Sequence, residues 1–127
     1  MPDLKASTVG QIAITAKDVE RATAFYRDVL GFAFLFSIPN GSFFDCGGVR
    51  LFIDKPEGEL FEHPASLVYF EVDDIHGTTA TLKERGVTFY QDPHMLAKMP
   101  DHELWMAFFH DTEGNILSIM SEVRGKD

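Results

Sequence analysis

Apolar positions along the chain recur in two periods, which mark strands and helices. Residues 11–16 alternate, a pattern typical of a β-strand with one buried face: Ile12, Ile14 and Ala16. The next apolar residues recur at steps of three and four, which predicts an amphipathic helix: Ala22, Phe25, Tyr26 and Val29. Asp18 is positioned to cap the start of this helix, and Gly31 to end it. Residues 32–38 are rich in β-forming side chains and predict a second strand.

The same pattern occurs a second time, in residues 67–89. When Asp74 is aligned with Asp18, the strand and helix patterns coincide, and Gly86 matches Gly31 with one deletion. The later hairpin segments resemble each other as well: 43–54 and 108–120. One short helix could match by chance, but strand, helix, glycine and hairpin in the same order predict two copies of one βαβββ unit.

The length of 127 residues is that of one domain, so the two half-sized units are expected to share a core. We therefore expect a single domain over 1–127. Its parts are a first unit over about 8–54, a linker over 55–64 and a second unit over about 65–123.

The two halves differ most at one place. The turn at 39–41 in the first unit is replaced in the second by residues 92–103, which predict a long loop. Long loops in compact domains often serve as binding loops or lids, although a plain surface loop is an equal alternative here.

Charge and composition narrow the classes of partner. The net charge of −9 argues against nucleic acid and against anionic membranes, because both require a positive face. No apolar run approaches the length of a membrane span, and residues 1–7 lack the apolar core of a signal peptide, so we expect a cytoplasmic protein. The single cysteine, Cys46, suits a reducing compartment and is expected to be a structural thiol.

Two segments resemble the signatures of a known family. IAITAKDVERATAFYRDVLGF is similar to the opening signature of the vicinal oxygen chelate superfamily, and HDTEGNILSI is similar to its closing signature. That superfamily includes glyoxalase I, methylmalonyl-CoA epimerase, extradiol dioxygenases and bleomycin-resistance proteins. The resemblance covers roughly residues 8–121 and implies an α+β fold. In that fold two tandem βαβββ units form an open barrel-like mixed sheet around a cavity, with the helices outside.

Strand alternation assigns the apolar and polar positions to the two sides of such a sheet. One set is expected to pack against the helices: Ile12, Ile14, Leu51, Ile53, Val68, Phe70, Leu117 and Ile119. The other set is expected to face the cavity: Gln11, Ala13, Thr15, Phe52, Leu67, Tyr69, Glu71 and Ser118.

The resemblance also allows a test for metal. Metal-dependent members of the superfamily hold a divalent ion with His, Glu or Gln at four symmetric positions, in the first and last strands of each unit. In this sequence those positions correspond to Gln11, Phe52, Leu67 and Ser118. Only Gln11 is a credible donor, since phenyl and aliphatic side chains have no donor atoms and a serine hydroxyl is a poor ligand. We therefore expect no metal and no cofactor.

The favoured hypothesis is a glyoxalase/bleomycin-resistance-like protein that binds a small organic molecule in a metal-free cavity. An apolar wall would be supplied by Phe52, Leu67, Tyr69 and Trp105. Orienting polar groups would be supplied by Gln11, Thr15, Glu71 and Ser118. The plain alternative is that the same aromatic side chains fill the barrel as ordinary core.

Two other functions stay open from the sequence. The first is a lyase, isomerase or epimerase whose metal or acid–base site has moved to His94, His102 and Glu103, together with Glu71 or Asp45. Spacing gives this little support, because neighbours in a strand point to opposite faces. Glu71, His102 and Glu103 are its candidate catalytic residues. The second is an interaction protein without a ligand. A homodimer, which the resemblance implies, is compatible with every hypothesis.

Overall fold

The computed structural model describes residues 3–5, 7–56 and 67–124. It divides into two compact units, one ending at His63 and one beginning at Pro64. Most of the predicted linker over 55–64, and the predicted start of the second unit at Ala65, lie outside the described residues. Among the helices described, none has both the length and the apolar character needed to cross a membrane.

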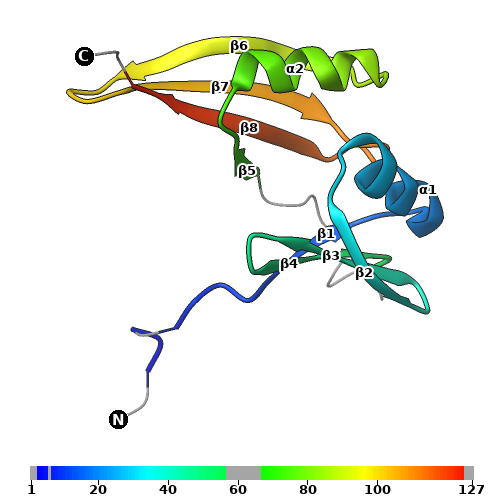
Figure 1. The fold of residues 1–127 in the computed structure, drawn as a ribbon. Helices are drawn as coiled ribbons and strands as arrows, with labels where there is room; N and C mark the ends of the chain where they lie inside the picture. Colours follow the sequence, from blue (N-terminus) through cyan, green and yellow to red (C-terminus); the bar gives the residue numbers. More distant parts are fainter. Residues whose placement is uncertain (1–2, 6, 57–66, 125–127) are drawn as a thin grey trace. The chain divides into compact units, whose positions relative to one another are not determined.

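Each unit contains one four-stranded mixed sheet (Figure 1). The first unit consists of β1 (Gln11–Thr15), α1 (Val19–Ala24), the π-helical segment η1 (Phe25–Val29), β2 (Ala33–Ile38), β3 (Gly41–Cys46) and β4 (Val49–Asp54). The second consists of β5 (Val68–Glu71), α2 (Ile75–Glu84), β6 (Phe89–Lys98), β7 (Glu103–His110) and β8 (Ile116–Val123).

The two sheets have the same topology. Their strand orders are β1-β4-β3-β2 and β5-β8-β7-β6. In both, the first strand of the unit pairs in parallel with the last, and the remaining pairs are antiparallel. The predicted duplication and the α+β fold class are therefore confirmed.

Helix starts lie where the sequence predicts them. The carboxylate of Asp18 accepts a hydrogen bond from the Arg21 amide at 3.0 Å, and that of Asp74 accepts one from the Gly77 amide at 3.0 Å. Each bond satisfies an amide that would otherwise lack a partner in the first helical turn. The helix ends also follow the prediction, because Gly31 and Gly86 both have positive φ, at 84° and 91°.

The π-helical segment η1 was not predicted. In a π-helix each amide bonds to the carbonyl five residues earlier, one residue further back than in an α-helix. Here the Leu30 amide donates to the Phe25 carbonyl at 2.9 Å. Tyr26 in this segment is fully buried and contacts the rings of Phe32 and Phe44. The apolar spacing of the sequence does not distinguish a π-helical turn from an α-helical one.

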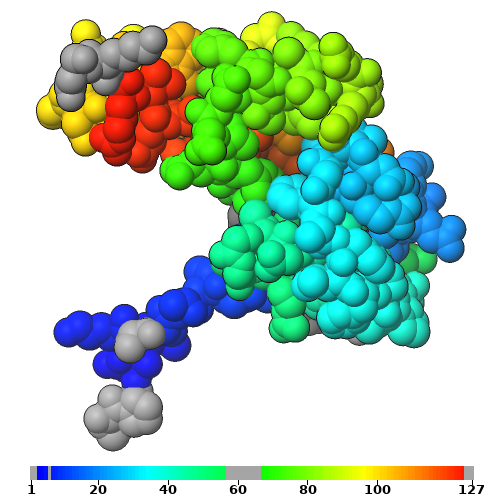
Figure 2. Space-filling view, in the orientation of Figure 1, coloured from blue at the N-terminus to red at the C-terminus, as the bar shows by residue number. Residues whose placement is uncertain are grey.

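In each unit one face of the sheet forms the core beneath the helix. In the first unit this core includes Ile14, Phe44, Leu51 and Ile53, and in the second Phe109, Leu117 and Ile119. In the second unit α2 lies along one face of the sheet (Figure 1), and its outer side is exposed in the space-filling view (Figure 2). The predicted helix-facing residues are all buried or half-buried, which confirms the predicted alternation.

The prediction of a long loop over residues 92–103 is wrong. Most of residues 92–103 belongs to the hairpin of β6 and β7, and only 99–102 forms the turn, where the Met99 amide donates to the His102 carbonyl at 2.7 Å. β6 is the edge strand of its sheet, and its register shifts between Gln91 and His94. Pro93 lies in this irregularity, where a missing amide hydrogen is tolerated. Pro93, which favoured a loop in the sequence prediction, is thus accommodated in an edge strand.

The closing signature of the sequence forms a tight turn between β7 and β8. The Asp111 carboxylate accepts hydrogen bonds from the amides of Glu113 and Asn115 at 2.8 and 2.9 Å, and from the Asn115 side chain at 2.8 Å. Gly114 has a φ of 83°, as Gly48 has a φ of 92° in the corresponding hairpin of the first unit. The turn of the closing signature is therefore built by a buried carboxylate and a left-handed glycine.

Candidate functional site

The side of the first sheet that faces away from α1 carries a row of stacked phenyl rings. Phe36 of β2 pairs with Phe43 of β3, and Phe43 pairs with Phe52 of β4. The ring centroids are 4.5 Å apart in the first pair and 4.4 Å in the second, with interplanar angles of 26° and 7°. We call these three residues the phenylalanine row.

Backbone register explains why the rings align. In paired strands, directly opposite residues point to the same side, so one residue from each strand contributes to a row. The row continues to Ala13 of β1, which is the partner of Phe52. Ala13 is exposed, and its methyl group leaves the fourth position of the row without a ring.

Gly41 leaves room for the ring of Phe52 from the neighbouring strand. A Cβ atom added at Gly41 would lie 2.5 Å from a ring carbon of Phe52, which is closer than carbon atoms approach. Gly41 itself is buried. The position of the Phe52 ring therefore depends on a residue without a side chain in the neighbouring strand.

The row next to the phenylalanines is polar. It contains Gln11 of β1 paired with Arg50 of β4, and Asp45 of β3 beyond it. The Arg50 guanidinium lies 5.6 Å from the centroid of the Phe43 ring, within cation–π distance. Among the described residues no carboxylate forms an ion pair with Arg50. On the other side of the row, Thr15 pairs with Asp54. Polar groups thus flank the position over Ala13.

The corresponding side of the second sheet is different. Tyr69, Ser118 and Phe108 form one row, and the rings of Tyr69 and Phe108 meet edge to face at 6.1 Å. Ser118 between them is fully buried, and its hydroxyl donates to the Ala107 carbonyl at 2.9 Å. The Ser118 hydrogen is therefore used inside the sheet, and the role of Ser118 as an orienting group for a ligand stays a prediction.

The four positions at which metal-dependent members hold an ion have different surroundings in this chain. Gln11 is exposed at the start of β1, Phe52 lies in the phenylalanine row, and Ser118 is hydrogen-bonded to backbone. Leu67 precedes β5 and is 51% exposed. Two of the four side chains have no donor atom, so these residues do not fit the metal. Within the described part of the chain no cluster of three or more His, Cys, Asp or Glu residues could hold one.

The residues of the predicted relocated site do not come together in the second unit. His94 pairs with Met106 and lies on the open side, where its ring is 6.4 Å from that of Phe108. Glu71 is on the same side of the sheet but three strands away. It lies in the same cross-strand row as His94, with Met120 and Met106 between them. No single ligand atom is within hydrogen-bond reach of both.

The other two candidates for that site are engaged elsewhere. His102 lies in the turn between β6 and β7, where its Nδ1 is 2.7 Å from the Asp101 carboxylate. Asp101 also accepts from Arg124 at 2.7 Å, and the hydrogen bonds from Arg124 and His102 lower the pKa of Asp101 to about 2. Glu103 accepts a hydrogen bond from the Trp105 indole at 3.1 Å.

Trp105 does not lie where the predicted cavity wall requires it. It pairs with Ser121, whose hydroxyl bonds to the Val72 carbonyl, and its ring lies 5.2 Å from that of His76 in α2. Trp105 is therefore on the helix-covered side of the second sheet, away from the open side. The strand period alone could have assigned it there, because Trp105 is two and four residues from the buried Ala107 and Phe109.

Cys46 and Asp45 provide no catalytic pair. Partial burial, with a smaller contribution from the Asp45 charge, raises the pKa of the Cys46 thiol above its ordinary value. A raised pKa leaves the thiol less nucleophilic at neutral pH. The Asp45 carboxylate accepts from the Gly48 amide at 3.3 Å in the hairpin turn, which is a structural role.

Sequence reasoning missed Phe36 and Phe43 as parts of the site. Both belong to strands that were recognised, but their alignment with Phe52 depends on the register of three strands. The Pro39–Asn40–Gly41 turn and the Gly47–Gly48 turn fix that register, since they set which residues of neighbouring strands lie opposite each other.

Two βαβββ units, each with a four-stranded mixed sheet and an apolar helix-covered face, define the class of the glyoxalase fold. The chain belongs to the Glyoxalase/Bleomycin resistance protein/Dioxygenase superfamily, whose family model matches residues 8–119.

Individual relatives agree with this assignment. A glyoxylase-like domain-containing protein of Didymella fabae is 30% identical over 125 residues, which cover 87% of this chain and 91% of the relative. The uncharacterized protein YurT of Bacillus subtilis (strain 168) is 30% identical over 131 residues, which cover 87% and 95%. The crystal structure of lactoylglutathione lyase from Agrobacterium tumefaciens is similar with a TM-score of 0.74 at 21% identity, covering 92% of this chain and 95% of that one.

Proposed function

We propose that this chain binds a small planar organic molecule on the open side of the first sheet and that binding requires no metal. The observation that carries the proposal is the phenylalanine row, which ends beside Ala13 at a family metal position occupied here by Phe52. Where metal-dependent relatives place a donor atom, this chain offers the face of an aromatic ring.

The spacing of the row supports this binding mode. The two ring separations, 4.5 and 4.4 Å, are close to the distance of about 4.8 Å between neighbouring strands, so each strand adds one ring at nearly the stacking distance. A planar ligand over Ala13 would continue the stack against Phe52. Offset stacking of two rings contributes about 0.5–1.5 kcal/mol beyond the burial of apolar area.

Gln11 and Arg50 supply the polar part of the proposed site. They lie one step along the strands from Ala13 and Phe52, and both are exposed. An aromatic surface with a few polar groups beside it is the usual composition of a small-molecule site, in which the polar groups fix orientation. The ligand class is therefore a planar ring system with a polar substituent.

The sharpest test is Ala13→Phe, which would place a protein ring in the position that we assign to the ligand. A thermal-shift screen of planar aromatic compounds such as 2-naphthol, quinoline and catechol first identifies a binder of the native chain. A ligand that binds only the folded state at 100 times its Kd stabilises that state by about 2.7 kcal/mol. We expect Ala13→Phe to abolish the shift while the protein remains folded, because a cross-strand aromatic pair is itself stabilising.

Ala33→Phe is the matched control. Ala33 lies on the same side of the same sheet, in the edge strand β2 opposite Asp45, and is exposed like Ala13. The control should bind the aromatic compound as the native chain does. Equal binding by Ala13→Phe and Ala33→Phe, or no stabilisation by any compound, would contradict the proposed site.

The alternative of an acid–base enzyme has less support. His94 and Glu103 lie on different sides of the second sheet, and His102 is bonded to Asp101 in the hairpin turn. Homodimer formation and a cytoplasmic location are part of the proposal but rest on the family resemblance and the sequence alone. Light scattering of the purified chain would test the dimer.

A further inference from the structure

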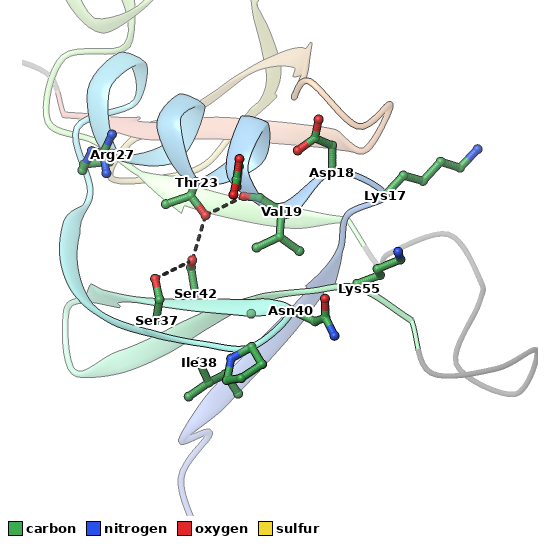
Figure 3. A pocket seen from close by; sticks show the side chains of 13 residues that line it. Lys17, Asp18, Val19, Thr23, Arg27, Ser37, Ile38, Asn40, Ser42 and Lys55 are labelled. Carbon is green, nitrogen blue, oxygen red and sulfur yellow. Dashed lines mark hydrogen bonds between the residues drawn. The ribbon is translucent and has the colours of Figure 1, made fainter.

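A polar groove lies on the opposite side of the first sheet from the phenylalanine row. It has a volume of about 770 Å³ and runs between α1 and the turn from β2 to β3 (Figure 3). None of the ligand-binding or catalytic residues predicted from the sequence lines it. Small-molecule sites in proteins typically have volumes of about 300–1,000 Å³, so the groove is of suitable size.

Three hydroxyl groups form a chain across the groove (Figure 3). The Thr23 hydroxyl donates to the Val19 carbonyl at 2.6 Å, a direction that is fixed because a carbonyl can only accept. Thr23 lies 2.7 Å from the Ser42 hydroxyl, and Ser42 lies 3.2 Å from the Ser37 hydroxyl. Thr23 and Ser42 are buried, whereas Ser37 is exposed.

The direction of the first bond fixes the other two. Thr23 has already used its only hydrogen, so Ser42 must donate to Thr23, and Ser37 must then donate to Ser42. The exposed end of the chain is thus the Ser37 oxygen, which has spent its hydrogen and presents lone pairs. A group bound there has to donate a hydrogen bond.

Charge limits the ligand further. Lysine and arginine side chains lie at both ends of the groove in Figure 3, with Lys17 and Lys55 at one end and Arg27 at the other. Lys17 and Lys55 disfavour a cationic donor, whereas the Arg27 guanidinium is already paired with the Asp28 carboxylate at 2.9 Å. An anion would meet the accepting end of Ser37 and the carboxylates of Asp18 and Glu20, which also line the groove. Neither sign of ligand charge is favoured.

From this arrangement we propose that the groove is a second binding site, for a neutral polyhydroxylated molecule such as a monosaccharide or related polyol. One hydroxyl of such a ligand can donate to Ser37 while other hydroxyls accept from the lysines at one end of the groove. The Val19 side chain points into the groove (Figure 3) and offers apolar surface to the C–H groups of a sugar ring.

The test is a titration of the isotope-labelled full chain, followed by NMR, with D-glucose, sorbitol and myo-inositol as probes. We expect saturable shifts at the amides of residues 17–20, 37–38, 40–42 and 55, from at least one probe. Inorganic phosphate and putrescine, tested in parallel, should produce no saturable shifts there. Ser37→Ala should weaken polyol binding about tenfold, the effect expected for one lost hydrogen bond.

Thr88→Ala is the control, because Thr88 is an exposed hydroxyl residue of the second unit, and it should bind the polyol as the native chain does. Ser37→Thr keeps the accepting oxygen and should retain most of the affinity. The proposal is overturned if no polyol binds, if phosphate or putrescine binds this groove more tightly, or if Ser37→Ala binds as well as the native chain. These outcomes are independent of aromatic binding on the other side of the sheet.

Discussion

At the scale of single residues, side-chain type decides whether the four positions that bind metal in metal-dependent members of the family can do so here. Phe52 and Leu67 have no donor atoms, and this could be predicted from the sequence once the family resemblance had assigned the four metal positions. That Phe52 lies in a row with two other rings could not, because the row depends on strand register. The environment of Ser118 was likewise hidden, since its bond to the Ala107 carbonyl joins two strands.

Gly41 provides a prediction at this scale. Gly41→Ala should destabilise the protein by about 1–3 kcal/mol, the usual cost of forcing an extra carbon into a packed position, because the new methyl group meets the Phe52 ring. It should also weaken aromatic binding by displacing that ring. Urea unfolding followed by circular dichroism measures the first effect.

Gly10→Ala is the control for this measurement. Nothing lies within 4 Å of a Cβ atom at Gly10, and its φ is not in the left-handed region, so its replacement should change stability little. If the two variants unfold at the same urea concentration, the close contact between Gly41 and Phe52 is wrong.

At the scale of elements, the longest departure from the sequence prediction is the β6–β7 hairpin. Pro93 and the charged residues around it are typical of a loop, yet this segment pairs with β7 through several register shifts. Edge strands tolerate proline and irregular pairing because only one of their sides requires hydrogen bonds. The helix starts were predicted well, because their signals are local. Asp18 and Asp74 each accept a hydrogen bond from the amide three residues later in the sequence.

The turn of this hairpin is fastened to the end of β8 by a pH-dependent contact. Asp101 in the turn accepts from Arg124, which follows β8, and its pKa is lowered from 3.8 to about 2. A carboxylate with a lowered folded-state pKa stabilises the protein above its unfolded-state pKa, and that stabilisation disappears as the pH falls through the folded-state pKa. The effect is expected to be small, because the pair is exposed to solvent.

Asp101→Asn should therefore lower the thermal midpoint slightly at pH 7. The difference from the native chain should shrink between about pH 4 and pH 2 as Asp101 becomes protonated in the native chain. Asp73→Asn, in the exposed segment before α2, is the matched control, because it removes the same charge and leaves the contact between Asp101 and Arg124 in place. A difference for Asp101→Asn that is constant from pH 7 to pH 2 would rule out the charged contact.

At the scale of the whole molecule, one topology occurs twice and carries two different surfaces. The duplication was visible in the sequence, because the order of strand, helix, glycine and hairpin is a linear pattern. The surfaces were not, since a row of rings in one sheet and a buried hydroxyl between two rings in the other arise from pairing between distant residues. A cavity shared by the two units stays a prediction from the family resemblance.

Binding without a metal is the central property that we propose for this chain. The decisive measurement is the Kd of the tightest-binding compound of the aromatic panel, determined by calorimetry on protein stripped with a chelator and again after addition of zinc or manganese. We predict the same Kd in both preparations, because Phe52 and Leu67 offer a divalent ion no donor atom. Binding that is lost on stripping and restored by one of the metals would contradict the central claim.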